Sequence, residues 1–264
     1  MNINSDSGGR RIKLAVSGKG GVGKTTLAGT LARLFARDGY RVLAIDADPD
    51  MNLGSALGIE KNPRPITEYK ELIEERASMP MGMYRMNPKV DDVIERCGCT
   101  GPDGVRFAVM GTLETGGSGC MCPASAFLKA LLRHVISREK DVVILDMEAG
   151  IEHLGRGTAR GVDAMIVVVE PGLRSIETVE RIKRLGENIG ITNLLAVINK
   201  TDDPGIVKEK LEEMGIPVLG TIPFDRNLIE ADLTGKAPVD VGGPAVEAIK
   251  RIKEELVRRF ESAP

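Results

Sequence analysis

Short runs of consecutive apolar residues recur along the chain and alternate with longer stretches in which apolar residues fall every three or four positions. The short runs are rich in Val, Ile and Leu, which is typical of strands buried on both faces of a sheet. They predict strands at residues 12–16, 42–45, 107–110, 142–145, 165–169, 194–198 and 218–220. The longer stretches predict helices at residues 24–36, 124–136, 176–189, 206–214 and 245–260.

The order of these elements predicts the fold class. Strands that alternate with helices of this length imply right-handed βαβ crossovers. We therefore expect an α/β fold with a mostly parallel central sheet and helices on both faces. Residues 11–264 form one domain in this interpretation, after a flexible polar tail at residues 1–10. Residues 58–123 interrupt the rhythm, and we expect them to be an elaboration of the core that carries all four cysteines.

The overall composition narrows the function classes. The 264 residues carry a formal net charge of −2, so the chain lacks the cationic excess with which nucleic-acid-binding proteins displace counterions. No apolar run approaches the ~18 residues that cross a bilayer. The first ten residues lack the apolar segment of a secretory signal. The sequence thus predicts a cytoplasmic protein with no nucleic-acid partner and no stable membrane association.

A glycine-rich loop stands between the first predicted strand and the first predicted helix. Its residues Gly18-Lys19-Gly20-Gly21-Val22-Gly23-Lys24-Thr25 match the pattern G-x-x-x-x-G-K-[ST], and Thr26 follows. The glycines let backbone N–H groups surround phosphate oxygens, and the helix N-terminus adds its positive dipole end. Lys24 would neutralise the β and γ phosphates, and the Thr25 hydroxyl would hold Mg²⁺. The loop predicts a nucleoside triphosphate site in a P-loop NTPase fold.

Carboxylates follow two of the predicted strands. Asp46, Asp48 and Asp50 come after the second strand, where they could orient a water molecule or reach Mg²⁺ through one. Asp146 ends an apolar strand, which is the Walker B arrangement for a carboxylate that supports Mg²⁺. Gly150, four residues later, could donate its N–H to the γ phosphate. Strand-end capping and turn chemistry are the alternative roles for Asp46, Asp50 and Asp146.

The four cysteines form two Cys-x-Cys pairs, Cys97/Cys99 and Cys120/Cys122. In a reducing cytoplasm such clustering points to metal or redox chemistry. Residues i and i+2 of an extended segment point the same way, so Cys120 and Cys122 could offer two thiolates to one Zn²⁺, Cu⁺ or Ni²⁺ ion. A tetrahedral site needs further ligands, from a second chain, from Cys97 and Cys99, or from a client protein. Inert, buried cysteines are the alternative, above all for Cys97 and Cys99.

The phosphate loop also resembles that of a particular class. Residues Gly18 to Thr26 read GKGGVGKTT, which is similar to the deviant Walker A motif of the MinD/ParA and nitrogenase iron-protein class. The resemblance implies that Lys19 reaches across a dimer and acts on the partner's nucleotide. It also implies that Asp48, which stands directly before a proline, is the switch I aspartate.

Two segments bear on the nucleotide base. Asn199-Lys200-Thr201-Asp202 matches N-K-x-D, which reads guanine in GTPases, whereas an asparagine at this place reads adenine in the MinD class. The pattern alone leaves the base open, and we favour ATP because Lys19 marks the class. Pro223 and Asp225 lie in a segment that resembles the second base-contacting loop of the class.

Four longer segments are similar to the CooC-type ATPases, which assist nickel insertion into carbon monoxide dehydrogenase. They are NPKVDD (87–92), GGSGCMC (116–122), DMEAGIEHLGRGTARGVD (146–163) and EPGLRSIET (170–178). The resemblance implies a homodimeric ATPase that hydrolyses ATP to ADP and phosphate, with carbon monoxide dehydrogenase as its client. It also implies that Cys120 and Cys122 of both chains bind one Zn²⁺ or Ni²⁺ at the dimer interface.

Two departures from the class bear on other functions. Met147, Glu148 and Ala149 occupy the positions near which the nitrogenase iron protein has a cluster cysteine, which disfavours an iron–sulfur electron-transfer ATPase. Together with Cys120 and Cys122, the additional pair Cys97/Cys99 could form a four-thiolate site within a single chain. The metal site is therefore either shared between chains or contained in one.

The last predicted helix helps to decide between two functions, a nickel-loading ATPase and a positioning ATPase of the MinD/ParA type. A positioning ATPase could use an amphipathic C-terminal helix to bind membrane, and Ile249, Ile252 and Leu256 have the spacing of one apolar face. Glu254 and Glu255 weaken its attraction to anionic lipid. We therefore expect this helix to pack against the core.

Overall fold

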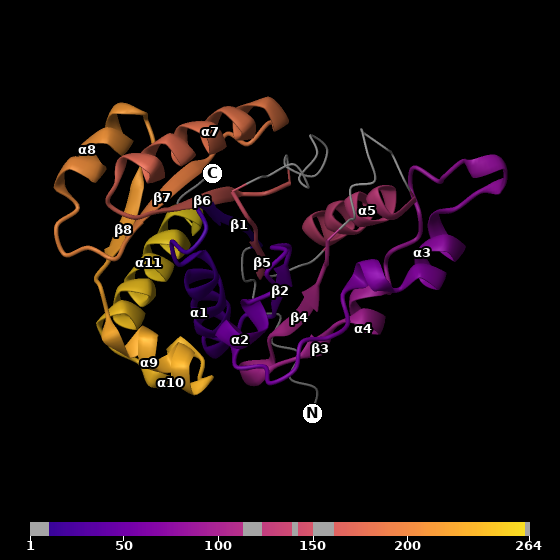
Figure 1. The fold of residues 1–264 in the computed structure, drawn as a ribbon, viewed down its shortest axis with the longest axis horizontal. Helices are drawn as coiled ribbons and strands as arrows, with labels where there is room; N and C mark the ends of the chain where they lie inside the picture. The colour runs from indigo at the N-terminus through magenta and orange to yellow at the C-terminus, as the bar shows by residue number, and fades with distance from the viewer. Residues whose placement is uncertain (1–10, 113–122, 139–141, 150–160, 262–264) are drawn as a thin grey trace.

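The structure is a computed structural model that describes residues 11–112, 123–138, 142–149 and 161–261 of the chain. Its centre is an eight-stranded sheet with the strand order β3-β4-β2-β5-β1-β6-β7-β8 (Figure 1). Every neighbouring pair is parallel except β3 and β4. The predicted mostly parallel α/β sheet is confirmed.

All seven predicted strands are present, and most extend one or two residues beyond the apolar runs. They are β1 (Ile12–Gly18), β2 (Val42–Asp46), β4 (Arg106–Val109), β5 (Val142–Asp146), β6 (Ala164–Val169), β7 (Leu194–Asn199) and β8 (Val218–Ile222). The two-residue edge strand β3 (Cys99–Thr100) is additional. The extensions add Asp46, Asp146 and Asn199 to the strands, which places these polar side chains at the carboxyl edge of the sheet.

Helices cover both faces of the sheet, as the alternation predicts. Successive strand residues point to opposite faces, so Leu14 and Val16 lie in one core cluster and Ala15 in the other. The face with Leu14 is covered by α1 (Lys24–Arg37), α2 (Leu53–Leu57) and α11 (Pro244–Glu261). The opposite face is covered by α3 (Lys70–Ala77), α4 (Val93–Cys97), α5 (Pro123–Arg138), α7 (Leu173–Ile189) and α8 (Gly205–Glu213).

Several short helices have no counterpart among the predicted elements. They are α2, α3, α4, α9 (Arg226–Thr234), α10 (Pro238–Val241) and the 3₁₀ turns Ile66–Glu68, Pro80–Gly82 and Pro102–Gly104. Helices this short show too little periodicity to be recognised, because packing and not local propensity stabilises them. Between residues 58 and 112 the chain supplies β3, β4, α3 and α4 at one side of the sheet, with α3 standing at its periphery (Figure 1).

The C-terminal helix packs on the core. Ile249, Ile252 and Leu256 of α11 are at most 1% exposed. Gly220 of β8 makes room for this packing, since a Cβ there would lie 2.8 Å from Cγ1 of Ile252. The expected core packing of this helix is confirmed, because its apolar face is already buried. Within the described ranges, no helix combines the length and apolar character needed to cross a membrane.

Candidate nucleotide site

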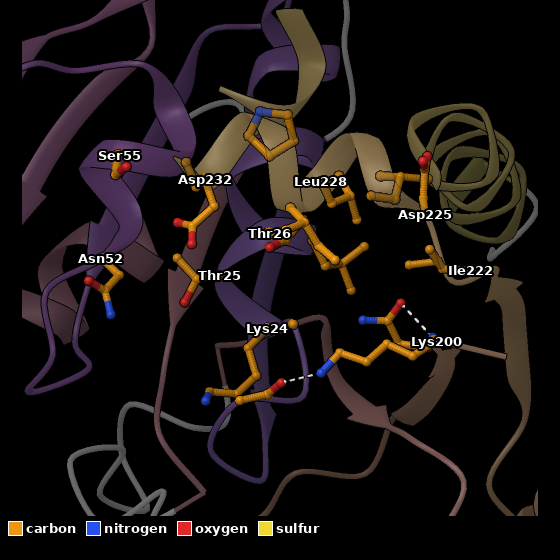
Figure 2. A pocket seen from close by; sticks show the side chains of 18 of the residues that line it. Lys24, Thr25, Thr26, Asn52, Ser55, Lys200, Ile222, Asp225, Leu228 and Asp232 are labelled. Atoms are coloured by element: carbon orange, nitrogen blue, oxygen red, sulfur yellow. Dashed lines mark hydrogen bonds between the residues drawn. The ribbon is translucent and has the colours of Figure 1, made fainter. Parts of the chain in front are cut away.

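The carboxyl ends of the parallel strands border a cavity of about 790 Å³ beside the glycine-rich loop. Ligands of open α/β sheets bind at this edge. Figure 2 shows Lys24, Thr25 and Thr26 at the start of α1, and Lys200 and Ile222 from the ends of β7 and β8. Other lining residues come from α2 and the residue before it, from α9 and from the turn after α9, and no sequence pattern pointed to them: Asn52, Ser55, Leu228, Asp232 and Lys236.

Most residues predicted to bind nucleotide line this cavity. They are Gly20, Gly21, Gly23, Lys24, Thr25, Thr26, Asn199, Lys200, Pro223 and Asp225, together with Asp48. Four predicted residues stand outside the lining. Val22 is fully buried, and Gly18 lies against β6. Asp146 is buried and accepts a hydrogen bond from the Thr25 hydroxyl, and the Lys19 ammonium lies near Glu170.

Backbone conformation explains three glycines of the loop. Gly18, Gly21 and Gly23 have φ angles of 151°, 74° and 96°, which residues with a Cβ rarely adopt. A Cβ on Gly18 would lie 2.5 Å from the carbonyl oxygen of Val168, so only glycine lets the loop lie this close to β6. A Cβ on Gly23 would lie 2.3 Å from Nδ2 of Asn199. The glycines therefore fit the loop to its neighbours as well as to a phosphate.

Two side chains at the end of β7 form hydrogen bonds with the glycine-rich loop. Nδ2 of Asn199 donates to the carbonyl oxygen of Val22 at 2.7 Å, and Nζ of Lys200 donates to that of Gly21 at 2.6 Å. Lys200 has a φ of 60°, a left-handed conformation that costs about 1–3 kcal/mol in a residue with a side chain. These contacts give the N-K-x-D residues a part in shaping the phosphate loop. The base contact remains a prediction.

Asp146 and Asp46 lie side by side at the ends of β5 and β2, because the parallel register pairs them. Oγ1 of Thr25 donates to Oδ2 of Asp146 at 2.6 Å, whereas the buried Oδ1 has no hydrogen-bond partner in the described part of the chain. Burial raises the pKa of Asp146 to about 7; the Thr25 hydrogen bond opposes this rise, and the Asp46 carboxylate adds to it.

This arrangement fits a magnesium ion. Mg²⁺ takes oxygen ligands, and a buried carboxylate with an unused oxygen beside a threonine hydroxyl supplies them. Thr25, Asp146 and Asp48 are the residues that would hold the ion, directly or through water. Bound there, it would neutralise charge on the phosphates.

Asp46 organises the loop that follows β2. Its Oδ2 accepts from the backbone N–H of Leu53 at 2.8 Å and its Oδ1 from that of Asp48 at 3.1 Å. Burial raises its pKa to about 6, and these two hydrogen bonds oppose the rise. Its described contacts are therefore those of turn chemistry. Asp48 faces Lys24, whose Nζ lies 3.6 Å from its Oδ2, and exposed Asp50 donates its N–H back to Asp48.

Asp225 caps two helices. Its Oδ1 accepts from the backbone N–H of Asn227 at 2.9 Å, and its Oδ2 accepts from that of Ala245, also at 2.9 Å. One carboxylate thus caps α9 and meets the first turn of α11. Pro223 and Phe224 line the cavity beside it, and Phe224 is 57% exposed. Base contacts by Pro223 and Asp225 stay predictions.

Lys19 meets a partner that the sequence patterns did not single out as a site residue. Its Nζ lies 3.8 Å from Oε1 of Glu170, the first residue after β6, and Oε2 of Glu170 lies 3.4 Å from Nζ of Lys200. A glutamate after a strand carries no signal of its own. Only the neighbouring positions of β1, β6 and β7 bring both lysines to it. The action of Lys19 on a partner's nucleotide stays a prediction.

The structure separates the thiols of Cys97 and Cys99. Cys97 ends α4 and is buried in the cluster beneath α5, whereas Cys99 begins β3 and packs against the cluster beneath α1. Burial raises the pKa of both thiols, which disfavours the thiolate form that metals bind. A metal role for Cys97 and Cys99 stays a prediction.

Three predicted site residues, Cys120, Cys122 and Gly150, lie outside the described residues. Among the residues that are described, no group of three or more His, Cys, Asp or Glu side chains could hold a metal ion.

The fold and the glycine-rich loop together define a P-loop nucleotide-binding protein. The family described as CobQ/CobB/MinD/ParA nucleotide binding domain matches residues 13–239, and the chain belongs to this family. An uncharacterised ATP-binding protein of Methanocaldococcus jannaschii is 42% identical over 94% of this chain and 98% of its own length. The carbon monoxide dehydrogenase accessory protein CooC of Rhodospirillum rubrum is 40% identical over 94% of this chain and 97% of its own length.

Solved structures share the fold. The MinD cell division protein of Aquifex aeolicus matches with a TM-score of 0.67 at 22% identity, over 96% of this chain and 98% of that one. MinD of Pyrococcus horikoshii, complexed with Mg-ADP, matches with a TM-score of 0.68 at 21% identity, over 93% and 95%. The predicted P-loop NTPase fold is confirmed, and with the family relatives the chain is an ATPase.

Proposed function

We propose that this ATPase is a metallochaperone that dimerises around ATP and assists nickel insertion into carbon monoxide dehydrogenase. The likeness to the Rhodospirillum rubrum accessory protein carries the proposal, because 40% identity extends over nearly the full length of both chains. The archaeal ATP-binding relative is as similar and has no stated substrate, so it neither supports nor opposes a nickel role. The proposal places the chain in the cytoplasm with ATP or ADP and Mg²⁺ as ligands.

The metal is cargo in this proposal. Cys120 and Cys122 from each of two chains would supply four thiolates to one Ni²⁺ or Zn²⁺ ion between the subunits. The placement of Cys97 and Cys99 in different core clusters supports a two-chain site, because these two thiols pack into separate parts of the core. Nucleotide-driven closure of the dimer would then gather or release the ion.

Metal content tests the two-chain site. With ATP and Mg²⁺ present, we expect about one Ni²⁺ or Zn²⁺ per two chains, and we expect Cys120→Ala/Cys122→Ala to lose it. Metal analysis combined with mass measurement in solution reads both quantities. Cys99→Ala is the matched control and should keep the metal, because its thiol packs against the core. One metal per monomeric chain would contradict the shared site.

Turnover tests the role of Lys19. Lys19→Ala is expected to bind ATP but to lose dimer-dependent hydrolysis by on the order of 10³-fold. A loss of this size is typical when a positively charged side chain that stabilises the transferred phosphoryl group is removed. Lys250→Ala, on an exposed position of α11, is the control. ATP affinity and turnover are measured over a range of protein concentrations. Unchanged turnover in Lys19→Ala would refute the role in trans.

The shared fold of the MinD proteins keeps a positioning ATPase as the second candidate. Sedimentation with anionic vesicles in ATP but not in ADP would favour that function over metal delivery. The buried apolar face of α11 speaks against membrane binding through this helix. An electron-transfer ATPase would show an iron–sulfur absorption spectrum after anaerobic reconstitution, and we expect none.

A further inference from the structure

Glu170 stands where three neighbouring strands end together. β6 lies between β1 and β7, and the register places Gly18 beside Val168. Glu170 follows β6 by one residue, as Lys19 follows β1 and Lys200 follows β7. The strand order therefore places the Glu170 carboxylate next to the ammonium groups of Lys19 and Lys200, which come from segments far apart in the sequence.

The two lysines are held differently. Lys200 donates to the carbonyl oxygen of Gly21 at 2.6 Å as well as facing Glu170 at 3.4 Å, so the loop itself anchors it. Lys19 faces Glu170 at 3.8 Å, and its side chain is 40% exposed. A half-exposed pair at this distance is weak, which lets another anion compete for the ammonium.

We infer that Glu170 is the positioning residue for Lys19. The Glu170 carboxylate keeps the Lys19 ammonium within its own subunit until the phosphates of the nucleotide in a second chain compete for it. The inference rests on the proposed dimer. A triphosphate carries several negative charges, whereas Glu170 shares one charge between two lysines, so the exchange favours the phosphates. In the single chain the contact restricts a long side chain that would otherwise sample many rotamers.

A double-mutant cycle tests this role. Glu170→Gln removes the charge and keeps the shape, and Glu180→Gln on an exposed position of α7 is the matched control. The readout is the protein concentration at which half of the chains are dimeric with ATP and Mg²⁺, from mass measurement in solution, which remains readable in Lys19→Ala because that variant still binds ATP. Glu170→Gln is expected to lower it about two- to five-fold, the range for a half-exposed pair, because Lys19 no longer has to leave a counterion. Glu180→Gln should leave it unchanged, and Glu170→Gln should have no effect in a Lys19→Ala background.

A second readout separates this inference from the dimer. In the single chain without nucleotide, the Lys19 amine is expected to react with an acylating reagent about two- to five-fold faster in Glu170→Gln, as measured by mass spectrometry. An unchanged rate overturns the contact. A concentration shift that persists without Lys19 overturns the positioning role, because Glu170 would then act through Lys200. If Lys19→Ala alone keeps full dimer-dependent turnover, the proposed trans step fails, while the acylation rate still reports on Glu170.

Discussion

Replacing Asp146 with asparagine is expected to lower Mg²⁺-dependent ATP turnover by about 10- to 100-fold and to stabilise the nucleotide-free protein at pH 8. The amide keeps the volume of the side chain and can still accept the hydrogen bond from Thr25. It lacks the negative charge that would support Mg²⁺ beside the phosphates. Activity and stability therefore change in opposite directions.

The gain in stability follows from the proton that Asp146 binds. Burial raises its pKa to about 7 in the folded chain, from an ordinary value of 3.8. Between these pH values the folded state holds more protons than the unfolded state, so stability falls as pH rises from about 4 to about 7. The loss is complete above pH 7 and is on the order of 2–4 kcal/mol. The side chain of Asp146→Asn does not ionise, so the variant does not undergo this loss of stability.

Urea unfolding at pH 5 and pH 8, without nucleotide or Mg²⁺, measures this effect. Asp50→Asn is the control, because Asp50 is exposed, and it should lose as much stability between the two pH values as the wild type. Asp46, with a pKa raised to about 6, adds a smaller loss in every variant. An equal pH dependence in Asp146→Asn and wild type would contradict the effect of burial. Unchanged turnover would contradict the magnesium role.

Gly18→Ala is expected to destabilise the nucleotide-free protein by about 2–5 kcal/mol. Two costs combine at this position. A φ of 151° is unfavourable for alanine, and the new Cβ would lie 2.5 Å from the carbonyl oxygen of Val168. The backbone of β6 cannot move without disturbing its pairing with β1. Urea or thermal unfolding gives the change in the free energy of unfolding.

Gly20→Ala is the matched control for Gly18→Ala. A Cβ on Gly20 meets no heavy atom within 4 Å in the described structure, and its φ lies outside the positive range. Its stability should stay within about 1 kcal/mol of wild type. Equal stability of the two variants would show that the loop shifts away from β6 at little cost, which would contradict the close approach.

Local patterns in the sequence were sufficient for the strands, the long helices and the phosphate loop. A buried parallel strand needs an uninterrupted apolar run, and a long helix over a sheet needs an apolar face, so both are written in consecutive residues. The glycine-rich loop and Asp146 are equally local, because each is set by its place directly after a strand. The short helices and the lining residues from α2 and α9 carried no such signal, since tertiary packing stabilises them.

The tertiary structure decided what the separate motifs do to one another. Strand order brought Glu170 between Lys19 and Lys200, and the pairing of β2 with β5 set Asp46 beside Asp146, where burial raises the pKa of both. Because α4 ends at Cys97 and β3 begins at Cys99, the two thiols of this Cys-x-Cys pair pack in different core clusters. Such contacts depend on register and on the face of the sheet. The contacts of Glu170 and of Asp146 join residues 30 to 151 positions apart, and no short window of the sequence contains them.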